Sequence, residues 1–172
     1  MGLLSSLFNR PYTIGELMNI DASRQDRAGR CIVELEKTYH ELKKETILDK
    51  FRSFFNGNSL INIYYVIFKL KVTSDTGTKH TVFIKLNPDF NLQNWSNNRI
   101  KIYCDCSDFK YRSAYKLQQH NSLFLNDKLK IQLGSSITDS PKNKSKITLL
   151  CKHSFAAVNW LISNYRALMM TI

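Results

Sequence analysis

The sequence predicts an α+β fold, because two hydrophobic periodicities follow one another along its 172 residues. Apolar residues recur every three to four positions between residues 23 and 56, which is typical of an amphipathic helix. From residue 59 to residue 104 apolar positions alternate, as in half-buried strands, and a helical period returns near the C-terminus. We therefore expect a long N-terminal amphipathic helix, a three-stranded antiparallel sheet and two C-terminal helices.

Residues 1–20 are predicted to form an N-terminal arm, in which Pro11 ends any first helix and Thr13 caps a short turn. We expect the arm to dock on a neighbouring subunit through its apolar residues Leu3, Leu4, Leu7 and Phe8. Residues 21–172 have the length of one ordinary domain, so we predict a single α+β domain there.

The long helix is predicted to begin at Ser23, where Asp26 completes a pattern that resembles a capping box. Its apolar stripe continues through residues 47–55, and Gly57 is placed to end it. The first part of the stripe consists of Ala28, Cys31, Ile32, Leu35, Tyr39 and Leu42. Cys31 is interpreted as a small apolar residue of this stripe.

The sheet is predicted from a β-hairpin and one further strand. Strands over 61–72 and 82–86 flank a turn signal at Ser74–Gly77. The third strand covers Arg99–Cys104, with Ile100 and Ile102 inward and with Lys101 and Tyr103 outward.

Two helices are expected after the sheet, one following Ser107 and a final one from about Lys152 to Leu168. Residues 120–147 separate them, with an exposed loop around Pro141. Its alternating Lys142, Lys144 and Lys146 are a possible DNA-facing group.

The charge is unevenly distributed. The net charge is +11, yet residues 1–56 hold 9 Lys or Arg and 8 Asp or Glu. The excess of basic residues therefore follows residue 56, and no Glu occurs after Glu45. Such a field attracts polyanions, but it also suits an acidic protein partner or a purely solubilising surface. The charge alone leaves these three readings open.

Two dipeptide-spaced pairs indicate a metal site. Cys104 and Cys106 stand at a strand end, and Cys151 and His153 stand at a helix start. Thiolate and imidazole are the usual ligands of structural zinc, so segments 104–106 and 151–153 predict a zinc knuckle. Three of the four cysteines fall in these pairs. Unliganded core cysteines and a disulfide or redox role are the alternatives, and His120 is a possible substitute ligand.

The order C-x-C followed by C-x-H resembles the SWIM-type zinc finger. That resemblance covers residues 99 to about 155, and it implies a β-hairpin plus a helix that binds nucleic acid or protein. The 44 residues between Cys106 and Cys151 exceed the usual SWIM spacing, which weakens the functional implication.

A second resemblance covers roughly the C-terminal 70 residues. The pattern that carries it is Cys104-x-Cys106-x-Asp108-Phe109-x-Tyr111-Arg112-x-Ala114-Tyr115, followed by Pro141 and Cys151-Lys152-His153. It is similar to a segment of virion proteins of large tailed bacteriophages, including crAss-like phages. The resemblance implies a neck or ring component at the head–tail junction, in a virion assembled in the host cytoplasm. The implied partners are portal, neck or tail proteins and further copies of the chain, with non-specific DNA contact.

Catalytic motifs are absent from the sequence, including phosphate-binding, dinucleotide-binding, zinc-protease and nucleophile-elbow patterns. We therefore predict a protein that is not an enzyme. No run of 18 apolar residues occurs, so no membrane span is expected. Three hypotheses follow: a zinc-stapled virion structural protein, a SWIM-type nucleic-acid-binding module, and a metal-free α+β domain.

Overall fold

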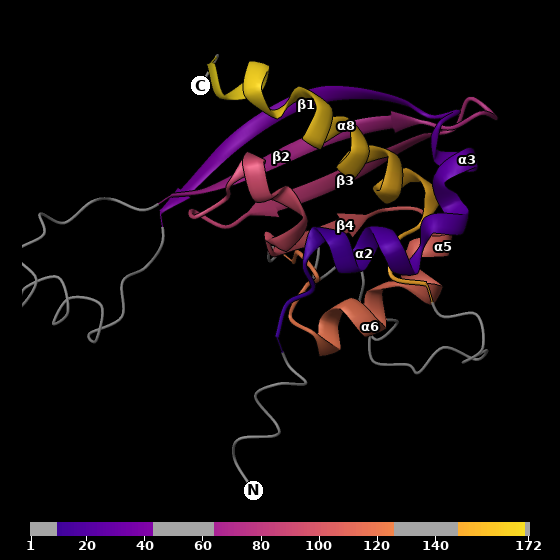
Figure 1. Ribbon diagram of the computed structural model, residues 1–172. Helices are drawn as coiled ribbons and strands as arrows, with labels where there is room; N and C mark the ends of the chain where they lie inside the picture. The colour runs from indigo at the N-terminus through magenta and orange to yellow at the C-terminus, as the bar shows by residue number, and fades with distance from the viewer. Residues whose placement is uncertain (1–9, 43–63, 126–147, 171–172) are drawn as a thin grey trace, which may run out of the picture.

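The computed structural model describes residues 10–42, 64–125 and 148–170 (Figure 1). It is an α+β structure built on a four-stranded antiparallel sheet in the order β1-β2-β3-β4. The strands are β1 (Ile32–Leu42), β2 (Tyr64–Thr73), β3 (Lys79–Leu86) and β4 (Ile100–Cys104). Short helices α2 (Ile14–Ile20), η1 (Ala22–Arg24) and α3 (Gln25–Ala28) precede β1, and η2 (Leu92–Asn97) precedes β4. The chain then forms α5 (Ser107–Arg112), α6 (Ala114–Gln119) and the long helix α8 (Lys152–Met170).

The core lies between α8 and one face of the sheet. Even-numbered residues of β2, β3 and β4 point to this face, and most are fully buried: Phe68, Leu70, Val72, Val82, Ile84, Ile100 and Ile102. Helix α8 lies across the strands on that face and contributes Phe155, Val158 and Leu161 (Figure 1). A strand side chain alternates between faces, so the odd positions face the other way.

The predicted long N-terminal helix is wrong, and the sheet has four strands instead of three. Residues 32–42 form the edge strand β1, which pairs with β2 in antiparallel register. A bulge places Glu36 as an extra residue between Leu35 and Lys37. After the bulge, the odd and even positions of β1 exchange the faces to which their side chains point. Apolar residues of this one strand therefore occur at the spacing of a helix. The remainder of the predicted helix, residues 43–56, lies outside the described residues.

Other predicted elements agree with the structure. Thr13 caps α2, since its hydroxyl accepts from the Glu16 amide while the Glu16 carboxylate accepts from the Thr13 amide. The β2–β3 hairpin turns at Ser74–Thr78, where Gly77 has a φ of 79°. Tyr103 lies on the opposite face from Ile102, as predicted, but it is only 2% exposed because Phe109 packs on its ring.

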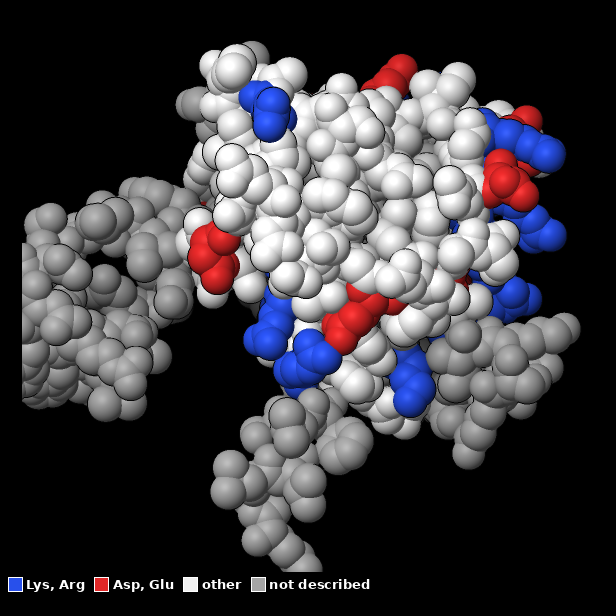
Figure 2. Space-filling model, viewed as in Figure 1, with Lys and Arg blue, Asp and Glu red and all other residues white. Residues whose placement is uncertain are grey.

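Within the described ranges, no helix is both long and apolar enough to cross a bilayer. Figure 2 shows that Lys, Arg, Asp and Glu are sparse over the face built by α8 and α2. Helix α8 itself carries only Lys152 and Arg166 among these residue types.

Candidate metal centre

Four side chains from two distant segments meet at one end of the core. The ligand atoms of Cys104, Cys106, Cys151 and His153 all lie within 4.8 Å of one another. All four residues are buried, with exposures between 0% and 5%. The two predicted pairs therefore form one cluster that could hold a metal ion.

The first pair is positioned by the end of β4. Cys104 is the last residue of the strand and occupies an even, core-facing position. The chain then turns, and Cys106 becomes the N-terminal cap of α5, where its Sγ accepts the Phe109 amide at 3.4 Å. Asp105 lies between them and is fixed to β3, because its carboxylate accepts the Thr81 amide at 3.0 Å.

The second pair is positioned by the start of α8. The Sγ of Cys151 accepts the amide of Ser154 at 3.3 Å, in the manner of a helix cap. Upstream, the buried carboxylate of Asp21 accepts the amides of Leu149 and Leu150 at 2.8 and 2.6 Å. The positive end of a helix stabilises negative charge, so α8 favours a thiolate at Cys151.

His153 supplies the strongest indication that the cluster is a ligand set. Both of its ring nitrogens are buried, and neither has a hydrogen-bond partner among the described residues. A buried polar atom without a partner is costly, and a metal ion would satisfy one of these nitrogens. The ring of His80 lies 4.1 Å from that of His153, between centroids, and its Nδ1 is 3.0 Å from an Asp105 carboxylate oxygen.

The thiols influence one another's ionisation. Burial raises the pKa of the Cys104 thiol well above its usual value, and the neighbouring Cys106 and Cys151 raise it further. Burial also opposes ionisation of Cys151, but the thiols of Cys104 and Cys106 donate to its sulfur and lower its pKa. The cluster therefore holds its thiols in unequal electrostatic environments, and a bound cation would stabilise the ionised form of all three.

The donor set fits zinc. Three sulfurs and one imidazole nitrogen form a common structural zinc site, with Zn–S distances of about 2.3 Å and tetrahedral geometry. Two ligand atoms of such a tetrahedron lie somewhat under ~4 Å apart. The four candidate ligand atoms here lie within 4.8 Å of one another, which is close to that separation. Four protein ligands complete the coordination shell, so they would leave no position for a substrate.

The other predicted site residues are not in this cluster. His120, the possible substitute ligand, stacks on Tyr12 with 4.3 Å between ring centroids. Cys31 is half-buried just before β1, and its Sγ lies 3.7 Å from the Arg27 carbonyl oxygen. The arm residues Leu3, Leu4, Leu7 and Phe8 and the lysines Lys142, Lys144 and Lys146 lie outside the described residues.

Sequence reasoning missed the residues that support the cluster. His80 lies outside both predicted ligand pairs and carries no signal in the sequence, yet its ring packs on that of His153. Asp21 gave no signal, because the two amides that it accepts are 128 and 129 residues away in the chain. Asp105 lies between the two cysteines of the C-x-C pair, and this position is the sequence signal that indicates a residue near the cluster.

Comparison with protein-family models, with curated proteins and with solved structures found no match. The SWIM and phage resemblances therefore depend on the motif spacing alone.

Proposed function

We propose that this chain is a non-enzymatic binding and assembly module whose fold is held by a structural zinc ion on Cys104, Cys106, Cys151 and His153. The observation that carries the proposal is the buried set of four candidate ligands, in which neither His153 ring nitrogen has a hydrogen-bond partner among the described residues. A site with an open coordination position would favour catalysis, whereas a closed site favours stability.

The location of the cluster supports a stabilising role. It joins the end of β4 and the adjacent start of α5 to the start of α8, which lies many residues later in the chain. Metal ligands in the unfolded chain are not preorganised, so the free energy of metal binding contributes to folding. Zinc would thus hold α8 against the sheet on which it packs.

The test is metal content by mass spectrometry on protein purified without chelators, together with thermal unfolding. We expect one zinc per chain in the wild type, and loss of zinc with a lower Tm in Cys104→Ser and His153→Ala. Cys31→Ser is the matched control, because Cys31 lies outside the cluster and should leave both quantities unchanged. Absence of metal from the wild type, or retention of full zinc in both ligand variants, would contradict the proposal.

The biological setting that we propose for this module is the phage virion, as a ring or neck component with portal, neck or tail proteins as partners. Only the sequence resemblance supports that setting. Gel filtration with and without a purified connector protein tests it, since a ring component should shift to a larger complex with the connector. An unchanged elution volume would argue against it.

The second candidate function is nucleic-acid binding. A specific observation favours it: the lysines of β2, β3 and β4 all lie on the sheet face opposite α8.

A further inference from the structure

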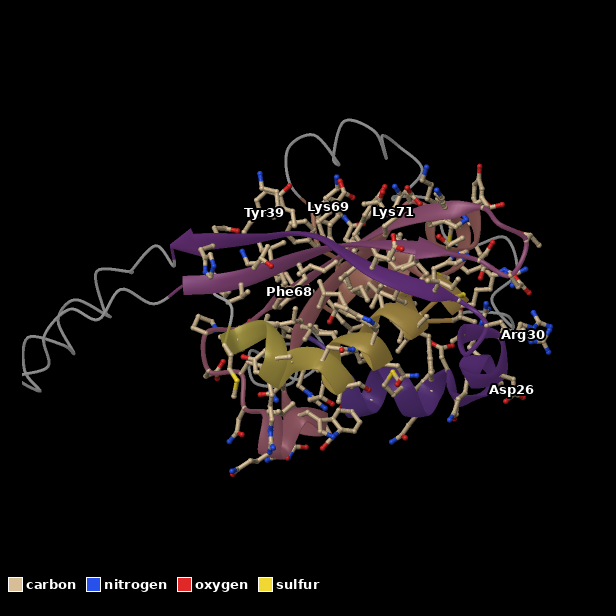
Figure 3. All side chains as sticks on the ribbon, turned by 90° about the horizontal axis from the view of Figure 1, so that it is seen from above. Asp26, Arg30, Tyr39, Phe68, Lys69 and Lys71 are labelled. Carbon is tan, nitrogen blue, oxygen red and sulfur yellow. The ribbon has the colours of Figure 1, made fainter. Side chains whose placement is uncertain are left out.

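The face of the sheet away from α8 is basic. It carries every lysine of β2, β3 and β4, all at odd positions, and these three strands contain no Asp or Glu. Figure 3 shows Tyr39, Lys69 and Lys71 on this side of the sheet and Phe68 on the side of α8. We call this surface the basic sheet face, and its lysines are Lys69, Lys71, Lys79, Lys85 and Lys101.

Two pairs of lysines on this face oppose one another directly. Lys85 is in register with Lys101 across β3 and β4, and Lys37 of β1 is in register with Lys69 of β2. Like charges at opposing positions destabilise a sheet. Two such lysine pairs on one face suggest that an anionic ligand binds there, because its negative charge would relieve the repulsion between the lysines.

Carboxylates from the edge strand offset only part of this charge. Glu41 accepts from the ammonium of Lys85 at 2.7 Å, Glu36 pairs with Lys69, and Glu34 lies in register opposite Lys71. The ammonium of Lys101 instead donates to the neutral amide oxygen of Asn121 at 2.8 Å. Burial lowers the pKa of Lys101, and the charge of Lys85 lowers it further. An anion beside Lys101 would stabilise the charged ammonium and so oppose both effects.

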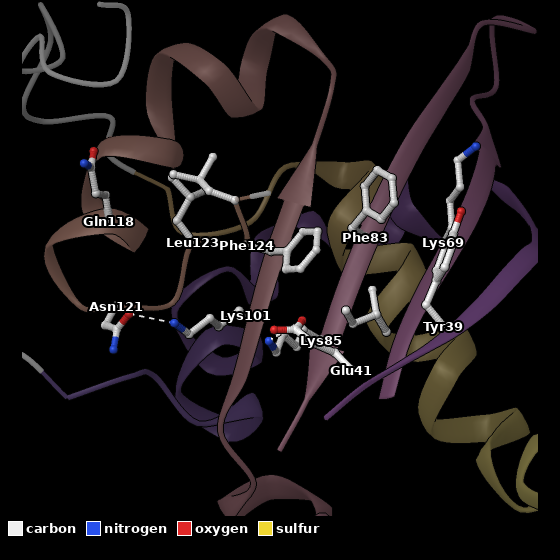
Figure 4. Close-up of a pocket in the computed structure, with 12 residues that line it drawn as sticks. Tyr39, Glu41, Lys69, Phe83, Lys85, Lys101, Gln118, Asn121, Leu123 and Phe124 are labelled. Atoms are coloured by element: carbon white, nitrogen blue, oxygen red, sulfur yellow. Dashed lines mark hydrogen bonds and ion pairs between the residues drawn. The ribbon is translucent and has the colours of Figure 1, made fainter. Parts of the chain in front are cut away.

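A cavity of about 940 Å³ opens on the same face (Figure 4). Lys69, Lys85 and Lys101 line it together with aromatic rings from different elements. The rings of Phe83 and Phe124 stack at 5.5 Å between centroids. Tyr39 is 38% exposed at the β1 side, and the ammonium of Lys37 lies over its ring at 5.0 Å from the centroid. The volume falls within the roughly 300–1,000 Å³ of ligand pockets.

We propose that the basic sheet face and this cavity bind single-stranded nucleic acid, with phosphates on Lys85 and Lys101 and a base stacked on Tyr39. Single-strand binders combine a cationic path for the backbone with aromatic rings for the unstacked bases. In a duplex the bases are stacked on one another, so their faces could not stack on the aromatic rings of this cavity. Polyglutamate could neutralise the lysines but has no flat rings for Tyr39 or Phe83, whereas every nucleotide supplies both a phosphate and a base.

This inference rests on the second candidate function and is independent of the proposed zinc site, because it depends on other residues and only requires that the fold is intact. Wild-type protein that holds zinc but does not bind a strand would refute the inference and leave the zinc proposal standing. Protein that contains no zinc but binds a single strand would support the inference and refute the zinc proposal.

The experiment is fluorescence anisotropy with labelled 12-residue strands of deoxythymidine and of uridine, over a range of salt concentrations, on the full chain. Two further probes are a duplex of the same length and polyglutamate. We expect wild-type protein to bind at least one single strand more tightly than the duplex. The deoxythymidine and uridine arms distinguish DNA from RNA as the source of the strand.

Three variants test the named residues. Lys85→Gln with Lys101→Gln should weaken binding at least about tenfold and reduce the slope of log K against log salt by about 0.7 per lysine. Tyr39→Leu keeps an apolar side chain at an exposed position and should weaken binding about fivefold or more, with no change in that slope. Glu41→Gln removes a competing carboxylate and should strengthen binding.

The matched control is Arg27→Gln with Arg166→Gln, which removes the same charge from exposed positions on α3 and α8. Circular dichroism and zinc content confirm that each variant is folded. The inference is overturned if wild-type protein shows no single-strand binding up to about 100 μM, the upper range for non-specific binding. It is also overturned if the control weakens binding as much as the lysine pair, or if duplex or polyglutamate binds as tightly as the strands.

Discussion

At the scale of single residues, Cys106 and Cys151 each combine the roles of candidate metal ligand and helix cap. Each is a candidate ligand, and each accepts a backbone amide at the start of a helix, from Phe109 and from Ser154. Hydrogen bonds donated to sulfur stabilise the thiolate, and the thiolate is the form that binds a metal. Serine or asparagine would cap a helix equally well, so capping alone does not require cysteine at either position.

Asp21 is the residue whose loss we expect to disturb the second ligand pair most without removing a ligand. Its carboxylate is 2% exposed and accepts two buried amides just before Cys151. Asp21→Ala would leave both amides unpaired, and each costs about 1–3 kcal/mol. We predict a loss of about 2–4 kcal/mol in the free energy of unfolding, measured by urea denaturation of the zinc-loaded protein.

Asp21→Asn is the control for that prediction. Asparagine keeps an oxygen that can accept from both amides, so the loss should be clearly smaller than in the alanine variant. Equal losses in the two variants would mean that the negative charge, and not the acceptor, is what the fold uses.

At the scale of elements, β1 shows where sequence periodicity is misleading. Because Glu36 is an extra residue in the strand, Val33 faces the core side before the bulge and Thr38 does so after it. Ile32 and Tyr39 are seven residues apart and 64% and 38% exposed, so their spacing imitates a helical stripe although no described segment covers it. An edge strand of this kind lacks the period of two by which strands are recognised.

The sheet interior and the ligand pairs could be predicted, and the reason is again local. Strands β2, β3 and β4 bury most of one face, so apolar residues alternate along much of their length, and β4 ends at Cys104, where the C-x-C pair begins. The contacts of Asp21, His80 and the lysine rows depend on register and on distant segments, which periodicity does not encode.

The cap of α2 offers a test of an element that was predicted correctly. Thr13 and Glu16 form a capping box, and the helix places Ile14 and Leu17 in the core. Thr13→Ala should reduce the free energy of unfolding by about 1 kcal/mol, because one amide of the first turn loses its acceptor. Thr13→Ser keeps the hydroxyl, so thermal unfolding should show it close to wild type. A loss as large in serine as in alanine would attribute the effect to the methyl group of Thr13.

At the scale of the whole molecule, the two faces differ in chemistry. The face of α8 and α2 carries few charged groups, whereas the opposite sheet face carries rows of lysine (Figures 2 and 3). The candidate metal centre lies where β4, α5 and α8 meet, so it fixes the helical layer to the strand that presents Lys101. This arrangement would let one face contact a protein partner while the other contacts a polyanion.

The metal centre should make the stability of the whole molecule depend on pH. Zinc binds thiolates, and the pKa of Cys104 in the metal-free protein is raised well above its usual value by burial and by the neighbouring thiols. Zinc must therefore displace protons near neutral pH, and its affinity must fall as the pH falls.

We predict that calorimetric titration of metal-free protein with zinc, in buffers of different ionisation enthalpy, will show proton release. We also predict that the Tm of the zinc-loaded protein will decrease as the pH is lowered to about 5. Cys104→Ser should not hold zinc, so it should show neither the proton release nor the zinc-dependent change of Tm with pH, while Cys31→Ser should match the wild type. Zinc binding without proton release would show that the thiols are already ionised in the metal-free protein, and that burial does not govern their chemistry.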